Sequence, residues 1–424
     1  MNYSEMTKEQ LKALHYEVYK KYEELKGMGL NLNMARGKPG TDQLELSMGM
    51  LNAVTPEDMM KGKDEMDFRN YGVLTGIQEC KELLAPMIES PAENIIVYGN
   101  SSLNIMYDTI SRSYTHGVMG STPWCKLDKV KFLCPVPGYD RHFAVTEFFG
   151  IELINIPTDN NGPDMDMVEE YVNNDAAVKG IWCVPKYSNP TGISYSDEVI
   201  KRFASLKPAA EDFRIFWDNA YCIHDLFDDD FAVILDIAEE CEKAGNPDMY
   251  YKFASTSKVT FPGSGVACIA ASKANIDWIT RQMTIQTIGH DKINMLRHVK
   301  FFGSFDGMKA HMKKHAALLR PKFAAVLNSL ESELGPTGIA SWTNPKGGYF
   351  ISLDVMEGCA KRVVSLCKEA GVVMTSAGAT YPYGNDPKDS NIRIAPTLPS
   401  PAELEKACEV LVTSVKLAAL EKLI

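Results

Sequence analysis

Lys258 stands directly after a run of apolar residues that is typical of a buried strand. Residues 253–258 read Phe-Ala-Ser-Thr-Ser-Lys, so the lysine amine follows the strand to a position that neighbouring elements can enclose. Burial lowers the pKa of a lysine amine, which favours its action as a nucleophile toward carbonyl groups or as a base. A strand-end lysine can also face water, so its polar neighbours decide between the two interpretations.

Two further polar side chains follow apolar runs in the same way. Asn189 begins the turn Asn-Pro-Thr-Gly after the run 181–184, and Asp218 follows the run 215–217, with Tyr221 three residues later. The carboxyl ends of parallel strands lie at one edge of a sheet, where open α/β sheets bind ligands. A generic turn and a helix cap are the alternative interpretations of Asn189 and Asp218. In order with Lys258, they indicate one shared site.

A fourth segment has the residues of an anion site. Gly99-Asn100-Ser101-Ser102 precedes a stretch, to about residue 114, that we expect to be helical. Free backbone N–H groups and the helix dipole at such an end favour a phosphate. A serine that only caps the helix is the alternative.

The elements that must position these residues alternate along the middle of the chain. Short apolar runs separated by helix-like segments predict a mostly parallel sheet between helix layers, a three-layer α/β/α domain. The expected strands are 94–98, 130–134, 152–157, 178–184, 213–217, 250–254 and 266–271.

The two ends of the chain have a different pattern. Thr7 and Gln10 fit a capping box before an N-terminal helix, and an irregular segment, 31–41, follows it. A long helix over 308–334 leads to strands at 339–342, 349–353 and 372, and helices at 358–370 and from 401. We expect an N-terminal helix and arm, 1–50, that joins a smaller α+β domain, 306–424, while 51–305 form the large cofactor-binding domain.

Composition excludes several classes of protein. The 424 residues include 44 basic and 55 acidic side chains, and the net charge of −11 argues against nucleic acid or an anionic membrane as the main partner. Neither a membrane span nor a signal pattern is present. The ten cysteines and eight histidines are dispersed, which predicts free thiols, no metal site and a cytoplasmic protein.

The whole set of motifs resembles the fold-type I, pyridoxal-phosphate-dependent aminotransferases of class I/II, and most of all a divergent aspartate aminotransferase subgroup. Each motif is weak alone, and their common order carries the resemblance. In chain order the matching segments are 36–40 (Arg-Gly-Lys-Pro-Gly), 70–72 (Asn-Tyr-Gly) with Gly76, 99–102, 137–139 (Pro-Gly-Tyr), 189–192, 218–221, 255–258, 345–350 (Pro-Lys-Gly-Gly-Tyr-Phe) and 391–393 (Asn-Ile-Arg).

The resemblance implies a role for each strand-end residue. Lys258 would carry pyridoxal 5'-phosphate, and Asp218 would keep the protonated pyridine nitrogen charged, so that the ring withdraws electrons. Asn189 and Tyr221 would donate hydrogen bonds to the phenolate oxygen of the ring, and Tyr139 would stack on its face. A core aromatic is the alternative for Tyr139.

The resemblance also implies how the phosphate is bound. Its ligands would come from two loops and from a tyrosine of a neighbouring subunit, and the candidates are Asn100, Ser101, Ser102, Ser255, Ser257 and Tyr71. The tyrosine from a neighbour implies a homodimer with shared active sites. One position departs from the pattern, because Gly265 occupies the place where many relatives have a phosphate-binding arginine. The sequence does not identify the cation that replaces it.

For the substrate, the resemblance implies that Arg393 binds the α-carboxylate, since a guanidinium suits a carboxylate bidentately. Gly37, Lys38 and Asn189 would line the same site. Arg297 falls about where relatives place an arginine that is supplied across the dimer interface to the distal carboxylate of aspartate. A solvated helix arginine is its alternative interpretation, and Arg36, Lys38 and Arg141 are rival cations for that role.

The function implied is transamination from an L-amino acid, aspartate by resemblance, to a 2-oxo acid, 2-oxoglutarate by resemblance, in a ping-pong cycle. Three alternatives stay open at this point. They are an aminotransferase for another amino acid, a pyridoxal-phosphate-dependent β-lyase that needs no amino acceptor, and a non-catalytic regulator on the same fold.

Overall fold

The computed structural model describes residues 2–60 and 66–424 of the chain. Its larger part is built on an eight-stranded sheet with the order β2-β9-β8-β7-β6-β3-β4-β5. The five central strands, from β8 to β4, are parallel, whereas β2, β9 and β5 pair antiparallel with their neighbours. The strands are β2 (Ile95–Val97), β3 (Lys131–Val136), β4 (Glu152–Asp159), β5 (Gly162–Pro163), β6 (Val178–Cys183), β7 (Arg214–Asp218), β8 (Tyr250–Ser255) and β9 (Ala267–Ala270).

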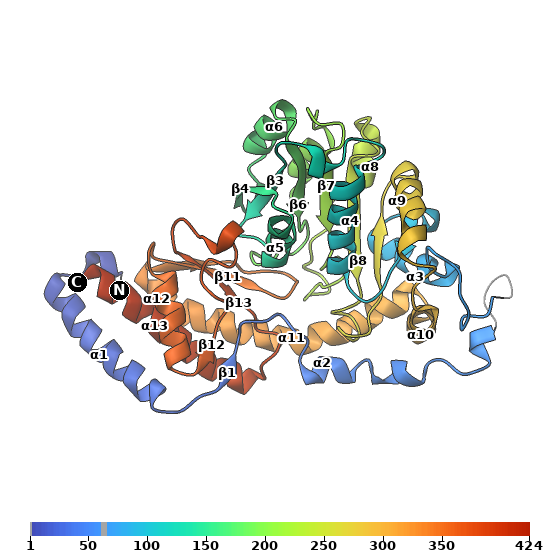
Figure 1. Ribbon diagram of the computed structural model, residues 1–424. Helices are drawn as coiled ribbons and strands as arrows, with labels where there is room; N and C mark the ends of the chain where they lie inside the picture. The colour runs from blue at the N-terminus through green and yellow to red at the C-terminus, as the bar shows by residue number, and fades with distance from the viewer. Residues whose placement is uncertain (1, 61–65) are drawn as a thin grey trace.

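Alternate residues of these strands pack into two different cores, one on each face of the sheet. The sheet and the helices on its two faces form three layers. Phe132 and Cys134 of β3 contact the cluster that includes α4, α5 and α9, and Leu133 between them contacts the cluster that includes α6, α7 and α8. Because the side chains of a strand alternate between its faces, these helix groups cover opposite faces of the sheet (Figure 1). The helices are α3 (Gln78–Ile88), α4 (Ser102–His116), α5 (Asp140–Phe148), α6 (Met165–Asn174), α7 (Asp197–Ala204), α8 (Ile237–Lys243), α9 (Lys273–Gln286) and α10 (Lys292–Phe302).

Both ends of the chain meet in a second, smaller unit. A three-stranded antiparallel sheet, β10-β11-β13, and a two-stranded parallel sheet, β1-β12, share one core with the helices around them. The strands are β1 (Leu32–Asn33), β10 (Ala340–Trp342), β11 (Ile351–Val355), β12 (Val372–Val373) and β13 (Asn391–Ile394), and the helices are α1 (Lys8–Lys26), α2 (Thr41–Glu45), α11 (Phe305–Leu334), α12 (Ala360–Glu369) and α13 (Pro401–Leu423).

Helix α11 connects the two units. It is continuous over 30 residues, and Figure 1 shows it running beneath the large sheet at one end and beside α12 and α13 at the other. Its buried residues belong to two clusters, because Met308 and Met312 pack in the core with α3 and α10, and Leu319 and Phe323 pack in the core of the small unit. A helix of this kind places the residues of both units at fixed positions around the space between them.

The fold class predicted from the sequence is confirmed, and short elements such as β1, β5 and α2 were missed. The segment 31–41, expected to be irregular, contains β1, which pairs in parallel with β12. Two residues are too few for an alternating apolar pattern to be visible in the sequence.

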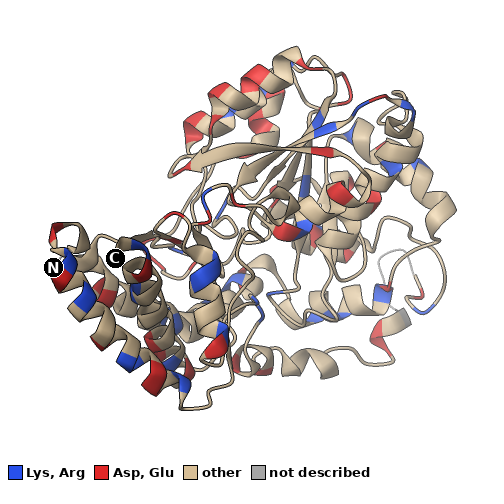
Figure 2. Cartoon of the chain, turned by 60° about the vertical axis from the view of Figure 1, so that its left-hand side comes forward, with Lys and Arg blue, Asp and Glu red and all other residues tan. Residues whose placement is uncertain are grey.

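The surface carries both signs of charge. In the view of Figure 2, acidic and basic residues are interspersed along the ribbon, and the N-terminal helix carries both. Within residues 2–60 and 66–424, none of the helices is long and apolar enough to cross a membrane, and no group of three metal-ligating side chains is arranged to hold a metal ion.

Candidate active site

The predicted site residues follow neighbouring parallel strands. Asp218 is the last residue of β7, Lys258 follows β8, Asn189 follows β6 and Tyr139 follows β3. Since β8, β7, β6 and β3 are adjacent in the sheet, their carboxyl ends bring these four residues to one edge. The order of motifs along the sequence thus becomes a cluster in space.

Lys258 has an enclosed amine. Its Nζ lies 5.0 Å from the centroid of the Tyr221 ring and 6.0 Å from that of the Tyr349 ring. Burial lowers the pKa of Lys258, and Arg393 lowers it further, whereas Asp218 opposes both effects. A lower pKa means that a larger fraction of the amine is neutral at physiological pH, and only the neutral amine can act as a nucleophile or a base.

Asp218 has one oxygen with a partner and one without. The side chain of Asp218 is almost completely buried, and His142 Nε2 lies 2.9 Å from its Oδ2. His142 is itself held by stacking on Trp182, with ring centroids 4.5 Å apart. Oδ1 has no hydrogen-bond partner among residues 2–60 and 66–424. A buried carboxylate oxygen is normally paired, so this oxygen fits a cationic N–H donor such as the protonated ring nitrogen of pyridoxal phosphate.

Arg393 lies on β13, across from this cluster, and belongs to the small unit. It is buried, and its Nη1 donates to Asp140 Oδ1 at 2.8 Å and to Asn189 Oδ1 at 3.3 Å. Phe350 lies under the guanidinium, 5.0 Å from ring centroid to Cζ. The Nε of Arg393 is buried without a partner in the described part of the chain. That nitrogen fits a carboxylate ligand, while Asp140 and Asn189 fix the orientation of the group.

Two tyrosines of the site keep their protons. Burial, followed by the nearby Tyr139 and Asp218, raises the pKa of Tyr221 well above its usual value. Burial also raises the pKa of Tyr139 to about 12, with Asp218 adding to the effect. Both phenols therefore stay protonated at neutral pH, so that Tyr221 can donate a hydrogen bond to an anionic oxygen.

The predicted phosphate loops meet at the start of α4. The Ser255 hydroxyl donates to Ser257 Oγ at 2.7 Å, and Ser257 Oγ donates to the Asn100 carbonyl at 2.6 Å. Ser101 is the N-cap residue of α4, and its side chain caps no backbone N–H of the described helix. The two serine hydroxyls thus lie at the loop that leads into the first turn of α4, an arrangement that fits an anion.

Gly265 lies tightly against the same loop. A Cβ at this position would lie 3.0 Å from the Ser257 nitrogen and 3.1 Å from Thr256 Oγ1. Asn294 Nδ2 donates to the Gly265 carbonyl at 3.0 Å, and Arg297 Nη1 donates to Asn294 Oδ1 at 3.4 Å. The close packing favours glycine here, and Arg297 is connected to the phosphate loop through one residue.

The remaining predicted residues are at the edge of the cluster. Gly37 lies against Phe350, where a Cβ would be 2.4 Å from the ring, so a larger residue would displace that ring. Lys38 is exposed, and its carbonyl accepts from Thr397 Oγ1 at 2.7 Å. Tyr71 is 84% exposed, so within a single chain its side chain is not part of an enclosed site.

Sequence reasoning missed three contacts of this site. His142 contacts Asp218, and Asp140 contacts Arg393. Phe350 lies against Gly37. Each of these contacts joins segments that are far apart in the chain. Only His142 had a local signal, because it lies three residues after Tyr139 and so on the same side of the first turn of α5.

A buried lysine, a buried carboxylate and a phosphate-type helix start, all at the carboxyl edge of a mostly parallel sheet, define a fold-type I pyridoxal-phosphate enzyme. Comparison with known proteins then gives the family. The family model described as "Aspartate amino-transferase" matches residues 6–424. The chain therefore belongs to the aspartate amino-transferase family, and it is a pyridoxal-phosphate-dependent aminotransferase whose substrates are small amino and 2-oxo acids.

Individual relatives agree with this assignment. An aspartate aminotransferase from Corynebacterium glutamicum is 47% identical over 414 residues, which are 97% of this chain and 95% of that protein. A crystal structure of an aspartate transaminase from C. glutamicum has a TM-score of 0.97 at 45% identity and covers 100% of both chains. An α-aminoadipate aminotransferase from Thermus thermophilus, complexed with N-(5'-phosphopyridoxyl)-L-leucine, shares the fold with a TM-score of 0.72 at 19% identity, over 95% of this chain and 96% of that one. The resemblance, the fold and the cofactor predicted from the sequence are thus confirmed.

Proposed function

We propose that this protein transfers the amino group of L-aspartate to 2-oxoglutarate. The observation that carries the proposal is the convergence of Lys258, Asp218 and Arg393 from the two units on one site. Similarity to aspartate aminotransferases over nearly the whole chain supports aspartate as the donor. We also propose that the domains divide at 50/51 and 305/306. A cytoplasmic location is proposed as well, and the ten free cysteines support it.

Each residue then has a defined task. Pyridoxal phosphate, when bound, supplies an electron sink for the bonds of the substrate Cα. Asp218 Oδ1 would hold the proton of the ring nitrogen, and Asn189 and Tyr221 would donate to the ring oxygen. Arg393 would bind the α-carboxylate and orient the substrate, so that the neutral Lys258 amine removes the Cα proton. Tyr139 would stack on the ring, and the phosphate would lie among Asn100, Ser101, Ser102, Ser255 and Ser257.

We further propose a homodimer in which Tyr71 of one subunit completes the phosphate site of the other. The exposure of Tyr71 supports this, since its side chain is accessible to a second copy of the chain.

A subunit-mixing experiment tests the shared site. We expect Tyr71→Ala to lose most activity at limiting cofactor, and a mixture of Tyr71→Ala with Lys258→Ala to recover about a quarter of the wild-type activity, because half of the dimers are hybrids with one intact site. The matched control is Tyr16→Ala, which removes another exposed tyrosine and should leave activity unchanged. No recovery on mixing would contradict a site shared between subunits.

Arg297 is proposed to bind the distal carboxylate of aspartate. Arg297→Ala is then expected to lower kcat/KM for aspartate about 100-fold, because removing one member of a buried charge pair costs roughly 3–5 kcal/mol before solvent relieves it. Alanine turnover should change far less. An equal loss of kcat/KM for aspartate and alanine would assign Arg297 to cofactor binding or to structure. Such a role is consistent with the hydrogen bonds that connect Arg297 to the phosphate loop through Asn294.

A panel of amino donors tests the substrate itself. With 2-oxoglutarate as acceptor, kcat/KM should be highest for aspartate. A preference for neutral or aromatic donors would remove the aspartate assignment and leave the aminotransferase intact. Turnover of an amino acid without any 2-oxo acid would favour the lyase alternative.

A further inference from the structure

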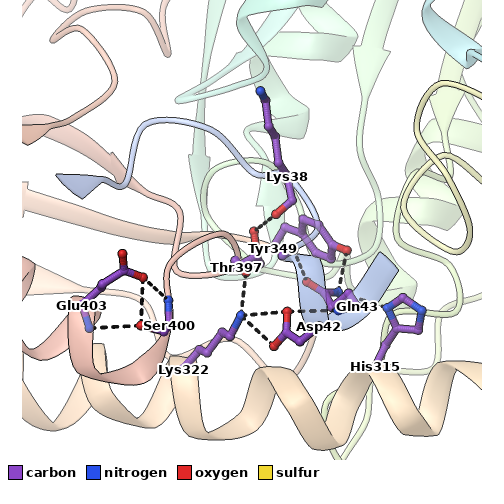
Figure 3. A network of polar contacts seen from close by, with 10 residues as sticks. Lys38, Asp42, Gln43, His315, Lys322, Tyr349, Thr397, Ser400 and Glu403 are labelled. Atoms are coloured by element: carbon purple, nitrogen blue, oxygen red, sulfur yellow. Dashed lines mark hydrogen bonds and ion pairs between the residues drawn. The ribbon is translucent and has the colours of Figure 1, made fainter. Parts of the chain in front are cut away.

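Gln43 is a completely buried side chain whose amide joins separate parts of the chain. It lies on α2, and its Oε1 accepts from the Gly40 nitrogen at 3.1 Å. Its Nε2 donates to Tyr349 Oη at 3.0 Å and lies 3.0 Å from His315 Nδ1 on α11. Figure 3 shows the amide between the phenol and the imidazole. Each polar atom of Gln43 is thus used, and both N–H groups have an acceptor in a different element.

From Gln43, one chain of hydrogen bonds leads to Lys258. Tyr349 accepts from Gln43 and donates to the Lys258 carbonyl at 3.3 Å. The direction is fixed, because the amide nitrogen can only donate and the carbonyl can only accept. The Tyr349 ring also contacts the Lys258 amine. One tyrosine therefore separates Gln43 from the main chain and the side chain of the catalytic lysine.

A second chain leads to the next peptide group. With Nδ1 accepting from Gln43, a neutral His315 carries its proton on Nε2, which has the Val259 carbonyl as its backbone acceptor. His311 Nε2 lies 2.9 Å from the same carbonyl and 3.0 Å from His315 Nε2. His315 can accept from Gln43 only as a neutral imidazole, and burial, together with His311, lowers its pKa to about 4. Through both branches, Gln43 is connected to the carbonyls of two consecutive residues, 258 and 259.

On its other side, Gln43 holds the arm that carries the substrate-site residues Gly37 and Lys38. Gly40, whose nitrogen donates to Gln43, ends this loop. Lys322 holds the loop independently, because its Nζ lies 3.1 Å from Asp42 Oδ2 and donates to the Thr397 carbonyl at 3.0 Å (Figure 3). Gly37 in turn lies against Phe350, the ring beneath Arg393. The position of the arm thus bears on the carboxylate site.

We propose that Gln43 is a positioning residue that couples the seating of the substrate arm, residues 36–42, to the position of Lys258. It acts through Tyr349 and through His315, and it touches neither substrate nor cofactor. The inference rests on the proposed site, in which Arg393 and the arm bind the substrate and Lys258 removes the proton. Loss of the Gln43 amide removes the hydrogen bonds both to the arm and toward Lys258. Loss of the Tyr349 hydroxyl removes only those toward Lys258.

Two variants and a control separate these effects. We expect Gln43→Leu, which keeps the volume and removes every hydrogen bond, to raise KM and lower kcat by about tenfold each. Tyr349→Phe should lower kcat similarly and leave KM within about twofold, since the contacts of Gln43 to Gly40 and His315 remain. Glu403→Leu is the control. It removes the acidic partner of another capping box, at the start of α13, and should leave both constants unchanged.

Hydrogen exchange on the substrate-free protein gives a readout independent of the donor assignment. In Gln43→Leu, the amides of residues 40–44 and also those of Val259 and Thr260 should exchange at least about tenfold faster than in the Glu403→Leu control. Acceleration at both ends, with the kinetic split above, supports the coupling. Acceleration confined to α2, or a Gln43→Leu protein with a lower Tm but wild-type KM and kcat, overturns it. If Gln43→Leu does not fold, Tyr349→Phe with wild-type kcat overturns it equally.

Discussion

Replacing Lys258 with alanine is expected to lower kcat by at least about 10⁴-fold, because the variant loses both the group that carries the cofactor and the base at the substrate Cα. The amine is enclosed by Tyr221 and Tyr349 and has a pKa lowered by burial, an environment that a solvent-exposed lysine lacks. Single-turnover and steady-state assays at saturating cofactor measure the loss.

Two controls keep this result interpretable. Lys273→Ala removes an exposed lysine that pairs with Asp277 on α9 and should retain full activity. Circular dichroism and thermal melting should show that Lys258→Ala is folded. Activity of Lys258→Ala within tenfold of wild type would remove this residue from the chemistry.

The second large effect is expected at Asp218. Both Asp218→Ala and Asp218→Asn should lose about 10³-fold in kcat or more, because neither keeps a charged oxygen for the ring nitrogen of the cofactor. Their stabilities should differ. Asparagine can still bond His142, which is fixed against Trp182, whereas alanine leaves the buried imidazole without a partner at a cost of about 1–3 kcal/mol.

This pair of variants distinguishes the chemical role of Asp218 from its structural role. The readouts are kcat at saturating cofactor and the free energy of unfolding in urea. A folded, cofactor-bearing Asp218→Asn protein with activity within tenfold of wild type would show that the carboxylate charge is not needed.

The sequence predicted that the strand-end residues gather at one edge of the sheet, because its signals there are local. Asn189, Asp218 and Lys258 each follow an apolar strand, and the rule that parallel strands end at one edge converts that order into proximity. The same local logic found the capping box of α1, in which Thr7 and Gln10 bond each other as expected. The strands of the large sheet other than β5 were found for the same reason, whereas the two residues of β5 are too few to show such a pattern.

Other parts of the site depend on contacts that the sequence does not contain. Asp140 meets Arg393, and Gln43 meets His315, across more than 250 positions, and no periodic pattern encodes such a pairing. Tyr71 and Arg297 pose a different problem, since their predicted roles need a second copy of the chain. These two roles stay predictions that only the experiments above can decide.

Borohydride reduction followed by peptide mapping shows which lysine carries the cofactor. Treating the cofactor-loaded enzyme with borohydride makes the bond between the cofactor and its lysine permanent, and mass spectrometry of a digest then locates it. We expect a single pyridoxyl-modified peptide, with the modification on Lys258. Modification of a different lysine, such as the buried Lys252, or no modification at Lys258 in an active preparation, would contradict this expectation.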